Sequence, residues 1–240
     1  MSCIQTCVFI LEILVDKGNE RGLTMIKAVI FDFDGLIIDT ETVWYEAFKG
    51  ALSQFEVDLT IEQFALVIGT DDAVLDKYIM DNIKESSTIS EIRELASNLF
   101  HEKIGQPVLR EGVEDYLIAA KEAGLKIGLA SSSKRNWVEK FLMQLHILPY
   151  FEVIKTRDDV TTVKPDPELY LQAIKALGVQ PEEAVAFEDS LNGLKAARAA
   201  GLKCVIFPNP VTTNLAFEDF SLMLFSMAEK PLEFILKELN

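Results

Sequence analysis

Three aspartates follow a short apolar segment near the start of the chain, in the stretch "VIFDFDGLIIDT" from Val29 to Thr40. Asp32 and Asp34 are two residues apart, so on an extended chain their side chains point to the same face, while Phe33 points to the other. Two carboxylates about 4 Å apart repel each other by about 4 kcal/mol at an effective dielectric constant of 20. Asp32 and Asp34 therefore cannot converge with the further carboxylates Glu188 and Asp189 unless a cation lies beside them.

Polar residues also follow three other apolar segments of the chain. They are Ser131, Ser132 and Ser133 after "LKIGLA", Glu188 and Asp189 in "EAVAFED", and Lys164 in "RDDVTTVKPDP". In a doubly wound sheet the functional groups gather where the strands deliver their carboxyl ends. We therefore expect these side chains to share one pocket with Asp32 and Asp34.

The chemistry of such a pocket is phosphoryl transfer assisted by a metal. Oxygen ligands, few of them from the protein, favour Mg²⁺, and the lack of nearby histidine or cysteine argues against zinc. The metal and Lys164 can accept a dianionic phosphoryl group, and serine hydroxyl and backbone N–H groups can complete its cradle. One aspartate can attack phosphorus to form an acyl phosphate. The other can protonate the leaving oxygen and later take a proton from water.

The elements that must position these residues alternate along the chain. Short apolar segments predict strands at 27–33, 125–131, 151–156, 183–189 and 203–208, and helical periodicity predicts helices at 113–124, 134–145, 165–178, 190–201 and 231–239. Gly124, Gly178 and Gly201 end three of these helices, as is typical of helix C-termini. The alternation predicts an α/β fold with a doubly wound, Rossmann-like parallel sheet.

The region 41–107 breaks this alternation, because it contains no convincing strand and shows four segments of helical periodicity. A helical block between the first strand and the rest of a sheet predicts an inserted α-helical cap domain on two hinges. We predict a catalytic core formed by residues 25–40 and 108–240, a cap of residues 41–107, and an N-terminal extension, 1–24, to which we assign no chemistry.

Composition and charge exclude several classes of partner. The 240-residue chain has 23 basic and 38 acidic residues, a net charge of −15 that repels nucleic acid and anionic membranes. The apolar run Cys7–Val15 contains Glu12 and has no basic residue before it, which argues against export or membrane insertion. Three irregularly spaced cysteines suit a reducing compartment. We expect a cytoplasmic monomer or weak homodimer with no nucleic-acid or membrane partner.

Four motifs stand in the order typical of a known family: "DFDGLIIDT", "LASSSKR", "VKPDPELY" and "AFEDSLNGLKAARAAG". Over residues 25 to about 210 the chain resembles the haloacid dehalogenase-like hydrolases, in the branch of β-phosphoglucomutase and similar sugar-phosphate phosphatases. The resemblance implies that Asp32 is the nucleophile and Asp34 the general acid and base. The implied substrate is a small phosphorylated metabolite.

The resemblance also assigns the binding residues. It implies that Ser131 and Lys164 hold the phosphoryl group. We expect the backbone N–H of Ser132 to complete the phosphate cradle, and a turn or capping role for Ser132 is the alternative. The resemblance implies Mg²⁺ binding by the Asp32 side chain, the backbone carbonyl of Asp34, and Asp189. Glu188 would bind the ion directly or through water.

Two departures from the mutase favour hydrolysis. The mutase has a histidine where this chain has Trp44, and it uses a cap arginine near the position of "GTDDAVL", where this chain has Asp71 and Asp72. Water is then the expected acceptor, which predicts a Mg²⁺-dependent phosphatase with an aspartyl-phosphate intermediate. A phosphomutase of the β-phosphoglucomutase type is the alternative, and a non-catalytic phosphate-binding module is a more remote one.

Other polar residues near the motifs have ordinary structural interpretations. We expect Asp39 and Thr40 to cap the first cap helix and form a hinge. We interpret Ser133 as a turn or capping residue. Trp44, one helical turn from the hinge, is interpreted as part of the cap core, with a position facing the pocket as the alternative.

Overall fold

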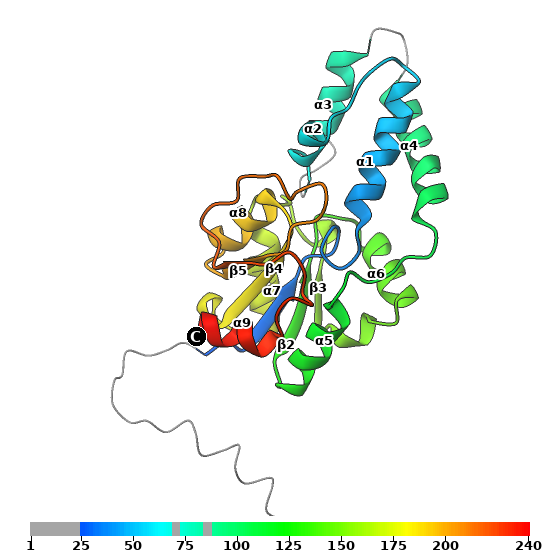
Figure 1. Ribbon diagram of the computed structural model, residues 1–240. Coiled ribbons are helices and arrows are strands. Elements are labelled where there is room, and N and C mark those ends of the chain that lie inside the picture. The colour runs from blue at the N-terminus through cyan, green and yellow to red at the C-terminus, as the bar shows by residue number, and fades with distance from the viewer. Residues whose placement is uncertain (1–24, 69–72, 84–87) are drawn as a thin grey trace, which may run out of the picture.

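The computed structural model describes residues 25–68, 73–83 and 88–240. Its centre is a six-stranded sheet in the order β3-β2-β1-β4-β5-β6, in which every adjacent pair is parallel (Figure 1). The strands are β1 (Ala28–Phe31), β2 (Lys126–Ala130), β3 (Val153–Lys155), β4 (Ala184–Glu188), β5 (Lys203–Ile206) and β6 (Leu222–Met223). The predicted parallel sheet is confirmed; β6 was not predicted, because two residues carry no periodic signal.

Helices cover both faces of this sheet (Figure 1). They are α5 (Val113–Glu122), α6 (Arg135–Gln144) and α9 (Leu232–Leu239) on one face, and α7 (Glu168–Leu177) and α8 (Leu191–Ala199) on the other. Strand β1 serves both layers, since Val29 and Phe31 pack with the first group while Ala28 and Ile30 pack with the second. A strand buried on both faces explains the continuous apolar run before Asp32.

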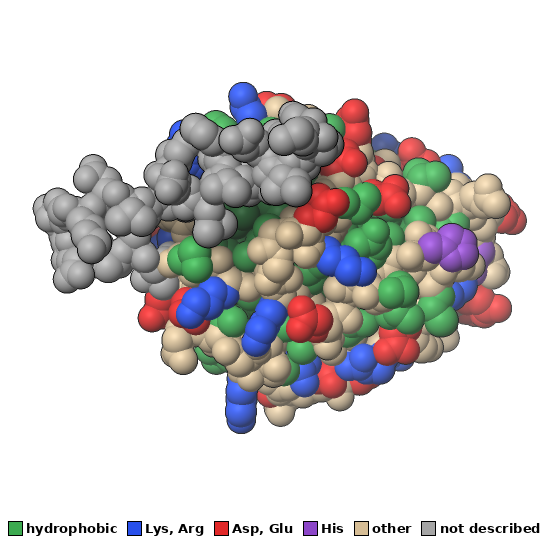
Figure 2. Space-filling model, turned by 90° about the horizontal axis from the view of Figure 1, so that it is seen from below, with side chains coloured by type: hydrophobic (Ala, Val, Ile, Leu, Met, Phe, Trp, Pro, Cys, Tyr) green, Lys and Arg blue, Asp and Glu red, His purple; other side chains and the backbone are tan. Residues whose placement is uncertain are grey.

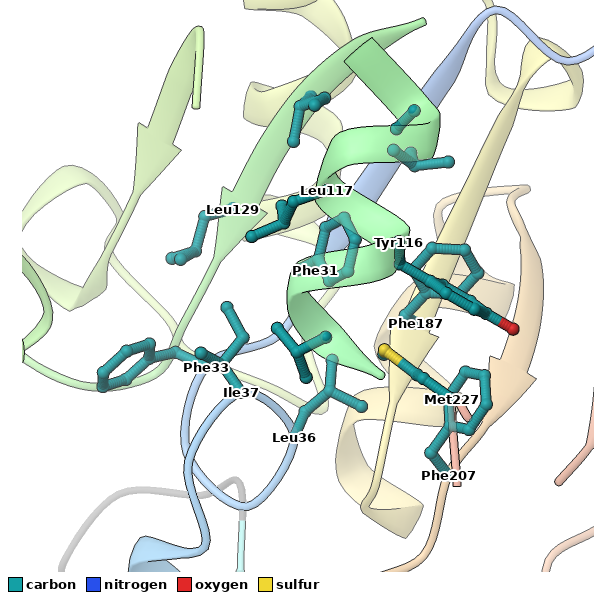
Figure 3. Close-up of a cluster of buried hydrophobic side chains, with 14 of the residues drawn as sticks. Phe31, Phe33, Leu36, Ile37, Tyr116, Leu117, Leu129, Phe187, Phe207 and Met227 are labelled. Carbon is teal, nitrogen blue, oxygen red and sulfur yellow. The ribbon is translucent and has the colours of Figure 1, made fainter. Parts of the chain in front are cut away.

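Aromatic side chains fill the layer under α5 (Figure 3). Phe187 packs edge-to-face against Phe31 at 4.9 Å and Tyr116 at 5.6 Å between ring centroids. The Tyr116 hydroxyl points out of the cluster and donates to the Lys230 carbonyl at 2.8 Å, so this buried tyrosine leaves no unsatisfied donor. Phe33 is fully buried in the same layer, as the alternation along the strand predicted. This packing fixes the backbone on both sides of Asp32.

Among the described residues, four helices lie between β1 and α5, and we call them the helical insert. They are α1 (Thr40–Ser53), α2 (Ile61–Ala65), α3 (Ala73–Asn82) and α4 (Ile89–Ile104). Helices α1 and α4 run side by side above the carboxyl edge of the sheet (Figure 1). The insert has a hydrophobic cluster of its own, which includes Leu52, Ile79 and Ile92.

One face of the molecule shows side chains of both charges. Acidic and basic side chains are interspersed on the face seen in Figure 2. Within the described part of the chain, no helix combines the length and apolar character needed to cross a membrane. Cys204 is buried in β5 as a free thiol.

Candidate active site

A pocket of about 560 Å³ lies between the carboxyl edge of the sheet and the helical insert. Five of the predicted site residues line it: Asp32, Asp34, Ser131, Ser132 and Asp189. The other two, Lys164 and Glu188, are buried and in contact with one another next to Asp32. The structure thus brings together residues that are up to 157 positions apart in the sequence, from 32 to 189.

Lys164 joins the two buried carboxylates at the base of the pocket. Its ammonium group donates to the Asp32 carboxylate and, at 2.6 Å, to Glu188 Oε1. Burial raises the pKa of Asp32 to about 8, even though the charge of Lys164 lowers it. Burial lowers the pKa of Lys164, but Asp32 and Glu188 together raise it more, and it lies above its usual value. Lys164 is therefore a permanent cation in this site.

Glu188 is held by donors on both carboxylate oxygens. The Tyr170 hydroxyl donates to Oε1 at 2.6 Å, and the Asp189 N–H and Ser190 hydroxyl donate to Oε2 at 3.2 and 3.3 Å. A Cβ at Gly193 would overlap this carboxylate, so a glycine is needed for the first turn of α8 to approach it. The sequence analysis did not identify Tyr170 as a site residue. Tyr170 lies in the motif "VKPDPELY", but its role comes from a tertiary contact with Glu188, which the sequence does not show.

Three of these residues form a cluster that could hold a metal ion. Carboxylate oxygens of Asp32, Glu188 and Asp189 all lie within 4.8 Å of one another. Asp189 Oδ2 accepts a bond from the Asn209 side chain at 2.6 Å, whereas its buried Oδ1 has no hydrogen-bond partner among the described residues. Burial and the charge of Asp32 raise the pKa of Asp189 well above its usual value. An unpartnered buried carboxylate oxygen beside two others fits a hard divalent cation.

Asp34 has a different environment, made of neutral donors. Its Oδ1 accepts from the Thr40 hydroxyl at 2.9 Å and from the Trp137 indole N–H at 3.0 Å, and its Oδ2 accepts from the Ser133 hydroxyl at 2.6 Å. Its side chain is not part of the acidic cluster above. Ser133 lies in the bend between β2 and α6, as one of its two predicted roles required, but it does not cap α6, whose N-cap is Lys134. Its hydroxyl is bound to Asp34, a contact that the sequence analysis did not predict.

Asp39 and Thr40, which the sequence analysis expected to act together as a helix cap and hinge, have different roles at the start of α1. Asp39 is the N-cap, and its carboxylate accepts from the Thr42 N–H at 3.1 Å, as predicted. Thr40 is already inside the helix, fully buried, and its hydroxyl is turned toward Asp34. Thr40 is thus a partner of the site and not a cap.

The serines after β2 border the same pocket. Ser131 is buried, its N–H donates to the Lys155 carbonyl at 2.9 Å, and its hydroxyl oxygen accepts from the Ser133 N–H at 3.0 Å. Ser132 lines the pocket beside it. That these two serines bind phosphate remains a prediction.

The insert supplies the opposite wall of the pocket, and much of this wall is apolar. Trp44 packs against the hydrophobic cluster of the insert and stacks on Phe100 at 4.1 Å, and it also lines the pocket, so both interpretations of Trp44 are confirmed. Phe48 and Phe64 line the same wall. Glu41 is its acidic member, and burial together with Asp34 raises the pKa of Glu41 well above its usual value.

The insert also contributes an arginine that the sequence analysis did not find. Arg93 of α4 lines the pocket and its Nε donates to Asp76 at 2.8 Å. Its position in a polar helical segment gave no signal of this, since surface arginines are common there. The residues compared with the arginine of the mutase, 69–72, lie outside the described part of the chain.

Comparison with known proteins identifies the family of this chain. The structure has a Rossmann-like parallel sheet with an acidic pocket at its carboxyl edge. The profile of the family "Haloacid dehalogenase-like hydrolase" matches residues 29–207. The chain belongs to this family, as the sequence analysis predicted.

Relatives and solved structures include phosphatases and mutases. "Putative phosphatase YhcW" from Bacillus subtilis is 49% identical over 217 residues, which cover 90% of this chain and 99% of that protein. Hexitol phosphatase B from Escherichia coli K12 is 32% identical, covering 79% and 86%. The structure of CbbY from Rhodobacter sphaeroides with xylulose-(1,5)bisphosphate has a TM-score of 0.71 at 31% identity, covering 85% and 96%. β-Phosphoglucomutase from Clostridium difficile has a TM-score of 0.73 at 28% identity, covering 90% and 98%.

Proposed function

We propose that this protein is a Mg²⁺-dependent phosphatase that hydrolyses a small phosphorylated metabolite, such as a sugar phosphate, through an aspartyl phosphate on Asp32. The observation that carries the proposal is the base of the pocket, where Lys164 bridges Asp32 and Glu188 beside the unpartnered oxygen of Asp189. The names of the relatives support the same class, because two of them are phosphatases, one of them for hexitols.

The two aspartates divide the reaction between them. The bound Mg²⁺ would neutralise the acidic cluster and the phosphoryl oxygens, with Asp32, Asp189, the Asp34 carbonyl and Glu188 as its proposed ligands. Asp32 attacks phosphorus, and Asp34 gives a proton to the oxygen that leaves. Asp34 then takes a proton from the water that cleaves the acyl phosphate. Lys164, Ser131 and Ser132 hold the phosphoryl group.

We propose that the insert acts as a cap domain, residues 41–107, over a core of 25–40 and 108–240. Its aromatic wall, with Trp44 and Phe48, would exclude bulk water during the first step. The acidic balance of the chain supports a cytoplasmic protein that does not bind nucleic acid. We propose a monomer or weak homodimer.

A panel of phosphorylated metabolites tests the function. The purified protein with Mg²⁺ is expected to release phosphate from at least one hexose or hexitol phosphate, and Asp32→Asn is expected to abolish this release. Asp115→Asn, an exposed carboxylate on α5, is the matched control and should keep it. Absence of release from every ester would refute the proposal.

A phosphomutase is the second candidate, and Arg93 is the observation that favours it. A pocket arginine on the insert could hold a second phosphate. Conversion of β-glucose 1-phosphate to its isomer without free phosphate would support the mutase and contradict the phosphatase.

A further inference from the structure

Trp137 is the one aromatic residue of α6 that meets both the insert and the polar site. Its indole N–H donates to Asp34 Oδ1 at 3.0 Å. Its ring lies 5.4 Å from Phe100 and 6.1 Å from Trp44, which both belong to the insert. None of the four motifs includes this residue, and its type alone predicts no more than core packing.

The ring of Trp137 is held from two sides. Phe100 and Trp44 contact it from the insert, and Phe141, one helical turn further along α6, packs edge-on at 4.7 Å from the core. Phe141 in turn contacts the buried Phe33, the residue between the two aspartates. The direction of the indole N–H is therefore fixed by packing and not by the hydrogen bond alone.

The chemistry of the donors distinguishes the two oxygens of Asp34. An indole N–H can only donate, whereas a hydroxyl can donate or accept. Oδ1 faces the indole and the Thr40 hydroxyl, while Oδ2 faces only the Ser133 hydroxyl among these partners. When Asp34 carries a proton, Oδ1 must still accept from Trp137, so the proton belongs on Oδ2 and the Ser133 hydroxyl turns to leave room for it.

We propose that Trp137 is a positioning residue, which keeps Asp34 Oδ1 as an acceptor and so presents the transferable proton on Oδ2. The inference rests on the proposed phosphatase function. In the first step an Asp32 carboxylate oxygen bonds to phosphorus as the bond between phosphorus and the ester oxygen breaks; the Oδ2–H bond of Asp34 breaks, its proton goes to that ester oxygen, and Asp34 becomes a carboxylate. In the second step the water oxygen bonds to phosphorus as the bond between phosphorus and Asp32 breaks; Oδ2 takes a proton from that water, and Asp32 returns to a free carboxylate.

The test compares two leaving groups in the variant Trp137→Phe, which keeps an aromatic ring and removes the N–H. The probes are p-nitrophenyl phosphate, whose phenolate leaves without a proton, and the hexose or hexitol phosphate that the unmodified protein turns over fastest, whose alcohol requires one. The kcat for the alkyl ester is expected to fall about tenfold, the equivalent of one hydrogen bond to a charged group, while its KM changes less than about twofold. The kcat for p-nitrophenyl phosphate is expected to fall less than about twofold.

Two further variants separate positioning from packing. Phe141→Leu loosens the packing that directs the Trp137 ring but keeps the indole N–H. The ratio of kcat for the alkyl ester to kcat for p-nitrophenyl phosphate is therefore expected to lie between the ratios of the unmodified protein and of Trp137→Phe. Thr40→Val removes the other donor to Oδ1 and is expected to lower the ratio as Trp137→Phe does. Circular dichroism and thermal unfolding establish that each variant is folded.

The outcomes distinguish this inference from the function on which it rests. Equal loss with both esters in Trp137→Phe, or a change in KM alone, overturns the role of Trp137 and leaves the phosphatase function intact. A ratio lowered equally in Phe141→Leu also overturns it. Absence of turnover of either ester by the unmodified protein refutes the phosphatase function itself.

Discussion

Asp32 and Asp34 have the same side chain and lie two residues apart, yet the structure gives them opposite surroundings. Asp32 is 7% exposed and lies among charges: the Lys164 ammonium and the carboxylates of Glu188 and Asp189. Asp34 is held by three neutral donors, the hydroxyls of Thr40 and Ser133 and the indole of Trp137.

The difference shows how one strand end can supply two chemical tasks. The charged surroundings of Asp32 require cations, and they keep its carboxylate in one place for attack on a phosphoryl group. Asp34 instead has hydrogen-bond donors without charge on both carboxylate oxygens, which orient it for the proposed proton transfer. Under the proposed function, the local environment of each aspartate, and not its residue type, distinguishes the nucleophile from the acid.

Loss of the cation at Asp32 is expected to have the largest effect on stability. Lys164→Met leaves Asp32 and Glu188 buried without their partner, which should cost about 3–5 kcal/mol in the free energy of unfolding. Urea denaturation in the absence of added metal measures this. Lys134→Met, at the exposed rim of the same pocket, is the matched control and should change stability by less than about 0.5 kcal/mol. Equal effects of the two variants would contradict the role of Lys164.

Loss of the Tyr170 hydroxyl, a neutral donor to Glu188, is expected to lower the free energy of unfolding by less than Lys164→Met does. Tyr170→Phe removes the hydroxyl that donates to Glu188 at 2.6 Å and keeps the buried ring. We expect a loss of about 1–3 kcal/mol by urea denaturation, because a buried carboxylate loses a donor. Tyr150→Phe, a half-buried tyrosine near α5, is expected to be nearly neutral. If the two variants are equally stable, Glu188 does not depend on Tyr170.

The acidic cluster also predicts how stability changes with pH and metal. In metal-free protein the folded state raises the pKa of Asp32 from 3.8 to about 8, so over this range the folded chain holds a proton that the unfolded chain has released. The melting temperature of the chelator-treated protein should therefore fall as pH rises from about 4 to about 8, through the contribution of this group.

Bound Mg²⁺ should reverse that trend, because it binds the deprotonated carboxylates and stabilises the folded state. The rise in melting temperature on adding Mg²⁺ is expected to grow between pH 5 and about 8 and to be largely lost in Asp189→Asn. Asp115→Asn should keep it. A shift that is independent of pH, or that survives in Asp189→Asn, would count against this metal site.

The charged residues around Asp32 could be predicted from the sequence, whereas most of the neutral donors to Asp34 could not. Asp32, Glu188 and Asp189 end strands of a parallel sheet, so their meeting follows from topology. Lys164 could be placed because its motif matched the family.

Trp137 and Thr40 occupy ordinary helical positions. They contact Asp34 only because the tertiary fold places α6 and the start of α1 beside it. Arg93 and Tyr170 were not predicted as site residues for the same reason. Periodicity assigns a residue to a helix face, but it does not show which other element that face contacts. The α/β sheet and the four helices of the insert, in contrast, followed from periodicity over long segments.

A burst experiment with p-nitrophenyl phosphate tests the division of tasks most directly. In Asp34→Asn the first step needs no acid with this ester, but cleavage of the acyl phosphate lacks its base. We predict a rapid burst of one p-nitrophenolate per protein molecule, followed by slow turnover, and a protein-bound phosphate that maps to Asp32. Asp32→Asn should show no burst. A burst that persists without the Asp32 carboxylate, or its absence in Asp34→Asn while the unmodified protein turns the ester over, would contradict the assignment of nucleophile and acid.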